Sequence, residues 1–195
     1  MMVYSAQKKK IKRLFDALPA SVMGHSIRTG IIMQTFIDAL MASAPGLLEK
    51  QGVTDYDDML TCAREFGFYH HIADNSEKSP ADLILHIFKG AINADGFYVN
   101  GLIDTVETHS EKWDGSGEKK LSGHAIPFWG RVCAIAEAYD NLTNTSTPRK
   151  AISIMSSLSG IAFDPELCSV FLKCYPELRS FVNSTGISRL RSGTM

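Results

Sequence analysis

The chain has 195 residues, of which 45% are hydrophobic and 21% are charged, and its formal net charge at pH 7 is -1. This length suffices for one well-buried core and is short for two, so we expect a single domain over residues 1–195 with a core of about 20–175. The charge excludes a nucleic-acid polymer as an electrostatically bound partner, because binding many phosphates requires a basic face.

The start of the chain lacks the apolar stretch of a signal peptide, and no segment approaches the roughly 18 uninterrupted apolar residues of a membrane span. We therefore expect a cytoplasmic protein that does not enter a membrane. The four cysteines have no paired spacing, which favours buried thiols over a zinc ribbon or a disulfide framework.

Apolar residues recur at helical spacing, for example between Ile27 and Leu40, and this pattern predicts an all-helical chain. Prolines 80, 127, 148, 165 and 176 are interpreted as helix starts, since proline suits the first turn. About eight helices are expected, over Ala6 to Leu18, Val22 to Ala42, Asp55 to His70, Ala81 to Asn93, Val99 to Thr108, Pro127 to Leu142, Pro148 to Leu158 and Pro165 to Cys174. The glycine-rich segment from His109 to Ala125 is long enough to be a functional loop.

Five of the six histidines are candidate metal ligands, and they are distributed over several predicted helices and the start of the loop. They are His25, His70, His71, His86 and His109. Metal sites in helical bundles are commonly built from single side chains on facing helices, which this distribution allows. Taken alone, each histidine is more often a packed or solvent-facing residue than a ligand.

The loop and the helix after it, from His109 to Asn144, have the sequence HSEKWDGSGEKKLSGHAIPFWGRVCAIAEAYDNLTN. This segment resembles the signature region of the HD-GYP family, in which a histidine pair leads into E-x-W-D-G-S-G-Y-P. A G-x-x-I-P step and a helix ending in D-x-Y-D-A-L follow in that family.

The resemblance continues upstream and downstream of the loop. HSIRTG from His25 is similar to the family's H-S-x-R, YHHIAD from Tyr69 to its L-H-D-I-G-K, and the spacing after His86 to its H-x-x-x-G. FDPEL from Phe163 resembles the closing motif, so the likeness runs to about Leu172.

This resemblance implies an all-helical HD-domain bundle that hydrolyses cyclic di-GMP at a centre of two or three metal ions joined by a carboxylate. The metal ligands that it implies by position are His25, His70, His71, His86, His109 and Glu137. The implied cofactor is a divalent transition metal (iron, manganese, zinc or nickel), as one or two ions, although nothing in the composition demands a metal for folding.

Three of the implied positions differ from the family in residue type. His71 replaces an aspartate, and a neutral imidazole offers one lone pair where a carboxylate can join two cations. Ser110 replaces a histidine, and Glu137 replaces an aspartate while keeping its charge. A single histidine-rich site made from His25, His70, His71 and Glu137 is therefore a plausible alternative to a bridged centre.

Asp74 takes the place of the family's lysine after H-D-I-G, where its charge would repel an anionic phosphodiester. If the helix continues past His70, Asp74 lies one turn further on the same face, and its carboxylate could replace the missing bridge. The alternative is a surface aspartate near a helix end. We assign the catalytic roles to His70, His71 and Asp74.

The substrate contacts are expected from Gly117, Arg149 and Lys150. The family's G-Y-P tripeptide is Gly-Glu-Lys here, and its R-P-Y-R stretch has lost the first arginine, which leaves Arg149 and Lys150 to reach a phosphate. Trp113 is expected to anchor the loop rather than stack on a base, and Asp140 to have a structural hydrogen-bonding role.

Two functions follow from these patterns. The first is a metal-dependent phosphohydrolase that acts on a cyclic dinucleotide or another small phosphate ester. The second is an inactive module of the same fold that acts in signalling by binding a nucleotide or a protein partner, such as a signalling protein. The resemblance favours the first function, whereas the changed ligands and substrate contacts favour the second.

Overall fold

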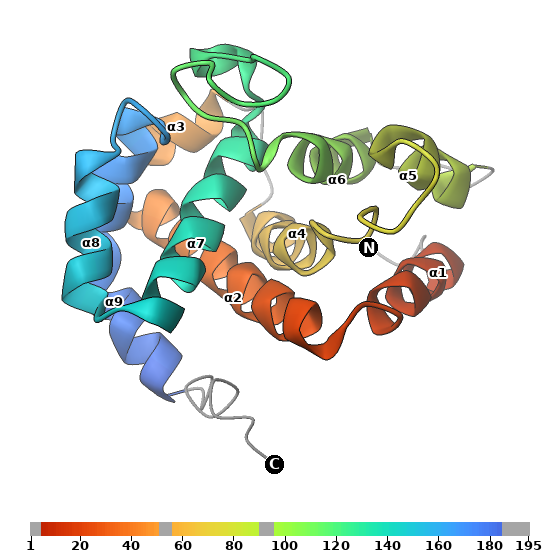
Figure 1. Cartoon of the computed structure of the whole chain (residues 1–195), viewed down its shortest axis with the longest axis horizontal. Helices are drawn as coiled ribbons and strands as arrows, with labels where there is room; N and C mark the ends of the chain where they lie inside the picture. The colour runs from red at the N-terminus through yellow and green to blue at the C-terminus, as the bar shows by residue number, and fades with distance from the viewer. Residues whose placement is uncertain (1–4, 51–55, 90–95, 185–195) are drawn as a thin grey trace.

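The structure is a computed structural model, and it describes residues 5–50, 56–89 and 96–184. These residues form nine α-helices and one 3-10 turn, and they contain no β-strand (Figure 1). The helices are α1 (Ser5–Asp16), α2 (Ala20–Ser43), α3 (Pro45–Glu49), α4 (Tyr56–Tyr69), α5 (Pro80–Phe88), α6 (Gly96–Thr108), α7 (Phe128–Thr145), α8 (Pro148–Ser157) and α9 (Pro165–Ser184), and the 3-10 turn is η1 (Gly123–Ala125). The predicted all-helical fold is confirmed.

Proline positions account for most of the helix starts. Pro80, Pro148 and Pro165 are the first residues of α5, α8 and α9, and Pro127 directly precedes α7. Pro176 was expected to open a helix, and this prediction is wrong because α9 passes through it to residue 184. The short helix α3 was not predicted, and the expected end of the helix over 81–93 lies outside the described residues.

Helix α2 is the central element of the bundle. It packs against α4, α7 and α9, and it runs through the middle of the view in Figure 1, with α8 and α9 on one side and α5 and α6 on the other. Aromatic rings fill the interior, as in the edge-to-face pairs of Phe36 with Phe171 and of Phe66 with Trp129. The four cysteines are buried thiols, as expected.

None of the described helices combines the length and the apolar character that crossing a membrane requires.

Helices α2 and α4 approach each other at two glycines. A Cβ atom added to Gly67 would lie 2.4 Å from the Cα atom of Gly30, and one added to Gly30 would lie 2.5 Å from the carbonyl oxygen of Arg64. Both obstacles are backbone atoms, so no side-chain rotation can relieve them. The glycines therefore set the distance between α2 and the end of α4, which His70 and His71 directly follow.

Alanine at Gly67 should force the two helices apart. We expect Gly67→Ala to lower the free energy of unfolding by about 2 kcal/mol or more, because overpacking of this kind typically costs 1–3 kcal/mol even where side chains can adjust. Urea unfolding measures the change. Gly46→Ala is the matched control, since a Cβ atom there meets nothing within 4 Å, and it should leave the stability unchanged or slightly higher. Equal stability of the Gly67 and Gly46 variants would contradict the tight crossing.

Candidate metal centre

Four side chains from three regions of the chain meet in the interior of the bundle. His25 lies in the second turn of α2, His70 and His71 form the turn after α4, and Glu137 lies in the middle of α7. One nitrogen or oxygen atom of each lies within 4.8 Å of the corresponding atoms of the other three. We call these four residues the ligand cluster.

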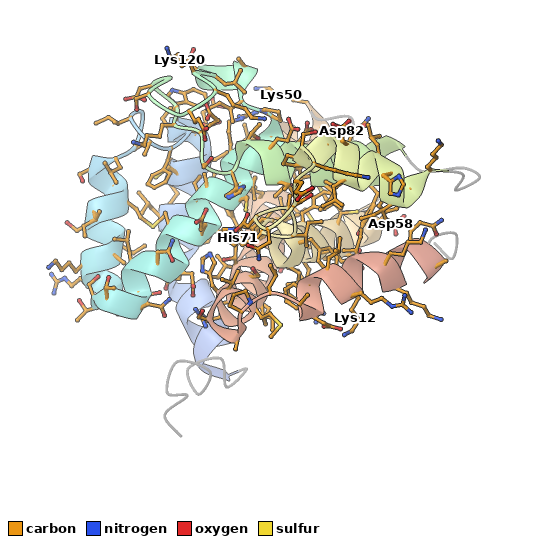
Figure 2. All side chains as sticks on the ribbon, turned by 45° about the vertical axis from the view of Figure 1, so that its right-hand side comes forward. Lys12, Lys50, Asp58, His71, Asp82 and Lys120 are labelled. Carbon is orange, nitrogen blue, oxygen red and sulfur yellow. The ribbon has the colours of Figure 1, made fainter. Side chains whose placement is uncertain are left out.

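The ligand cluster is buried on one side and reachable on the other. His70 is fully buried, while the side chains of His25 and Glu137 are 13% and 22% exposed. Figure 2 shows His71 near the middle of the molecule, and its side chain is 20% exposed. A small ion or molecule can therefore approach the cluster from the side of His71 and Glu137.

Each histidine of the cluster is held through its Nδ1 atom. This atom lies 2.8 Å from a carboxylate oxygen of Asp140 in His25, 2.6 Å from the carbonyl oxygen of Gly67 in His70, and 2.8 Å from a carboxylate oxygen of Asp74 in His71. Carbonyl and ionised carboxylate oxygens only accept hydrogen bonds, so Nδ1 must be the donor in each case. In the neutral imidazoles the lone pair is then on Nε2.

The Nε2 atom of His70 is buried and has no hydrogen-bond partner. Burial, together with the charges that His71 and His109 would carry, lowers the pKa of His70 well below its usual value of 6.5. Burial also lowers the pKa of His71, against the opposing effect of Asp74. Both rings are therefore neutral at pH 7, and a buried lone pair without a partner calls for a ligand.

Asp140 connects the ligand cluster to the fold. Its buried carboxylate accepts hydrogen bonds from Arg28 at 2.7 and 3.0 Å as well as the one from His25. Burial alone would raise the pKa of Asp140, but the hydrogen bonds from His25 and Arg28 outweigh it and lower the pKa. The expected structural hydrogen-bonding role of Asp140 is seen in these contacts, which join α2 to α7.

The donors of the ligand cluster are suited to a metal ion. Three imidazole nitrogens and one carboxylate oxygen are a common donor set for a transition metal and a poor one for magnesium or calcium. Hydrogen bonds from the outer ring nitrogen to a carboxylate or carbonyl are also the usual partners of metal-binding histidines. The unpartnered Nε2 atom of His70 and the fixed orientation of all three rings fit such an ion.

His109 and His86, the other two predicted ligands, differ in position. The ring centroid of His109 lies 5.1 Å from that of His70 and 5.4 Å from that of His71, and its Nδ1 donates to the carbonyl of Thr105 at 3.0 Å. His109 therefore borders the ligand cluster. His86 is exposed on α5, because this helix turns Ile84, Ile87 and Phe88 inward, and the structure does not bring it to the cluster.

Asp74 differs from its expected role as a bridging ligand. That expectation required the helix to continue past His70, but α4 ends at Tyr69 and a turn follows. The carboxylate instead approaches the outer nitrogen of His71, and its side chain is 50% exposed. Asp74 is not among the four residues whose ligand atoms converge.

The predicted substrate contacts lie on two other segments of the chain, the loop after α6 and the start of α8. Arg149 and Lys150 are exposed in the first turn of α8, beyond the end of α7. Gly117 packs on the carboxylate of Glu111, where an added Cβ atom would lie 2.7 Å from a carboxylate oxygen. A Cβ atom there would have to displace this carboxylate, so packing within the loop gives Gly117 a structural role.

The loop between α6 and α7 is held by Glu111, whose role the sequence alone did not reveal. Its buried carboxylate accepts hydrogen bonds from the backbone N–H groups of Lys119 and Leu121 at 2.8 and 3.1 Å. Trp113 contacts His124 edge to face and lies 5.9 Å from the guanidinium of Arg131, which fits the loop anchor that we expected. The signal for Glu111 was its fixed place in the E-x-W-D-G-S-G motif.

A pocket of about 340 Å³ lies elsewhere on the bundle. Its lining includes Lys50, His124, Arg131 and Glu166, and no residue of the ligand cluster lines it. Figure 2 shows Lys50 toward the end of the molecule that carries Lys120, away from His71. Two of its buried lining residues, Arg131 and Asp164, form an ion pair with each other, so their charges are compensated within the protein.

Comparison with known families finds a match to part of the chain. Residues 98–167 match the family described as HD domain. The matched segment includes His109 and Glu137 and begins after His25, His70 and His71. Of the four residues of the ligand cluster, the family match therefore covers only Glu137.

Curated relatives are similar over about a third of the chain. A cyclic di-GMP phosphodiesterase of Vibrio cholerae is 42% identical in an alignment of 72 residues that covers 33% of this chain and 15% of the relative. A cyclic di-GMP phosphodiesterase of Thermotoga maritima is 35% identical over 78 residues, which cover 36% of this chain and 21% of the relative. A 3'3'-cGAMP-specific phosphodiesterase of Vibrio cholerae is 35% identical over 77 residues, covering 36% and 15%. The chain thus spans no more than about a fifth of the length of these relatives.

Metal binding should depend on His71 and not on His86. We expect the wild-type chain to retain zinc after dialysis, His71→Ala to lose most of it because one of four donors is missing, and His86→Ala to retain it because that ring is exposed on α5. Elemental analysis of the dialysed proteins measures the difference. Equal zinc in the two variants would show that the ligand cluster is not the binding site.

The metal-free protein should lose stability on acidification. The lowered pKa of His70 means that the unfolded chain takes up a proton near pH 6.5 and the folded chain does not. The contribution of His70 to the free energy of unfolding is therefore complete above pH 6.5. It is lost as the pH falls below 6.5, by up to about 1.4 kcal/mol per pH unit. Urea unfolding with a chelator present, at pH 7.5 and at pH 5.5, measures this loss. His86→Asn should show the same loss and His70→Gln a smaller one; a pH-independent wild-type stability would refute the prediction.

Proposed function

We propose that this protein is a metal-dependent phosphohydrolase of the HD type, more closely of the HD-GYP type, that hydrolyses a cyclic dinucleotide such as cyclic di-GMP. The observation that carries the proposal is the convergence of His25, His70, His71 and Glu137 within 4.8 Å, with the buried Nε2 atom of His70 left without a partner. The HD-domain match and the names of the similar phosphodiesterases support the same chemistry.

One divalent transition metal ion, rather than a bridged pair, is the cofactor that this cluster suits. His71 donates a hydrogen bond from its Nδ1–H to Asp74 and retains a single lone pair on Nε2, so it cannot join two cations as a carboxylate does. Iron, manganese, zinc and nickel are the ions compatible with three imidazoles and one carboxylate. Such an ion would act as a Lewis acid toward a phosphoryl oxygen and lower the pKa of water.

The residues of the chain supply positioning and proton transfer. The carboxylate of Glu137, 3.9 Å from the Nε2 atom of His25, adds the negative charge that a cation requires. His109 donates a hydrogen bond from its Nδ1–H to the carbonyl of Thr105. The lone pair of the neutral ring is then on Nε2, which can accept and return a proton beside the ligand cluster. The buried face formed by His70 limits the approach of water from within the bundle.

A binding module without hydrolytic activity is the second candidate. The specific observation in its favour is the hydrogen bond between His71 and Asp74. It engages the carboxylate that could have bridged two ions, and it places a negative charge beside the opening of the site. An anionic phosphodiester would be repelled there unless a metal ion compensates the charge. In this case the bundle would act in signalling by binding a nucleotide or a protein partner.

Hydrolysis should require Glu137. Samples of the full chain loaded separately with manganese, iron or zinc are assayed with cyclic di-GMP and with 3'3'-cGAMP, and linear products are separated by chromatography. We expect turnover with one bound ion, a loss of at least about 100-fold in Glu137→Gln through the missing donor charge, and no loss in Glu118→Gln, an exposed loop carboxylate. A bound ion with no hydrolysis of either substrate would select the binding module.

A further inference from the structure

We propose that Asp74 is a positioning residue that turns the imidazole of His71 so that its Nε2 atom faces the metal ion. This inference rests on the metal site of the proposed function. It concerns a residue outside the four ligands, whose carboxylate oxygen lies 2.8 Å from the Nδ1 atom of His71.

The turn after α4 brings the two side chains together. The backbone N–H of Ile72 donates to the carbonyl of Tyr69 at 3.0 Å, and that of Asp74 donates to the carbonyl of His71 at 3.2 Å. Ile72 and Ala73 between them are buried and anchor the turn in the core. The side chains of His71 and Asp74 therefore leave the same turn with their polar atoms in contact.

His71 needs such a partner more than the neighbouring histidines do. The outer nitrogens of His70 and His109 donate to backbone carbonyls within or at the end of their own helices, and that of His25 donates to the fully buried Asp140. His71 follows the end of α4 and is held by a half-exposed side chain instead. A ring without this hydrogen bond can rotate and can present either nitrogen to an ion.

The contact has two separable effects on a bound metal. The acceptor oxygen fixes the tautomer with hydrogen on Nδ1, and the negative charge strengthens the donation from Nε2. Asparagine at position 74 keeps an acceptor oxygen and removes the charge, whereas alanine removes both. The two variants therefore distinguish orientation from charge.

Zinc affinity tests this inference without relying on catalytic activity. Competition with a chromophoric chelator gives the zinc dissociation constant of the full chain and of Asp74→Ala, Asp74→Asn and Glu77→Gln. Glu77 is an exposed carboxylate three residues further on, so its substitution removes the same charge without touching His71. We expect zinc to bind about 10- to 100-fold more weakly to Asp74→Ala, less weakly to Asp74→Asn, and within about twofold of wild type to Glu77→Gln.

The tautomer of His71 provides a readout that a purely structural role would not change. Nitrogen-15 NMR of the imidazole rings in the metal-free protein should show hydrogen on Nδ1 of His71 in wild type and in Asp74→Asn, and a mixture of tautomers in Asp74→Ala. Circular dichroism spectra of the variants should coincide with that of wild type, since Asp74 is half exposed.

The outcomes separate this inference from the proposed function. Equal zinc affinity of wild type and Asp74→Ala would overturn the positioning role and leave the phosphohydrolase intact. If zinc binds more weakly to Asp74→Ala and the wild-type protein hydrolyses no cyclic dinucleotide, the first result would support the positioning role and the second would contradict the proposed activity. A wild-type chain that binds no zinc, manganese or iron would overturn both.

Discussion

The close crossing of α2 and α4 is the constraint on which the rest of the structure depends. Gly30 and Gly67 allow the two backbones to touch, so the end of α4 lies directly beside the first half of α2. His70 then lies fully buried next to His25, although 45 positions separate them in the numbering of the chain. A wider crossing would move the turn after α4 away from α2 and α7, and the ligand cluster would lose its geometry before any ligand was changed.

The orientation of the imidazoles is the second level of organisation. The bundle provides an acceptor for the outer nitrogen of every histidine at the site, so the lone pair of each neutral ring is on its other nitrogen. Burial keeps His70 neutral, so its lone pair is available without a competing proton. A site prepared in this way loses little conformational entropy when an ion arrives, because the side chains already hold the orientation that binding requires.

The sequence predicted the helices better than the individual roles of the polar residues. Periodicity and proline positions located most helices, because both signals are local, and the four converging side chains were all among the predicted ligands. His86 shows the limit: its helix was predicted, but which face turns inward depends on packing with α6, and Ile84 and Ile87 take that face. The position of Asp74 depended on where α4 ends, and Glu111 was recognised only as part of a motif because its hydrogen bonds go to backbone atoms that no side-chain pattern reveals.

Two carboxylates hold ligand histidines, and they differ in how freely each can change during evolution. Asp140 serves Arg28 and His25 at once, so any substitution there alters the joint between α2 and α7 together with the site. Asp74 has a half-exposed side chain that accepts a hydrogen bond from His71. Selection can therefore vary the pair of His71 and Asp74 as a local unit while the remainder of the bundle stays intact. A change in this pair would alter how the cluster holds an ion and would leave the contacts between α2 and α7 in place.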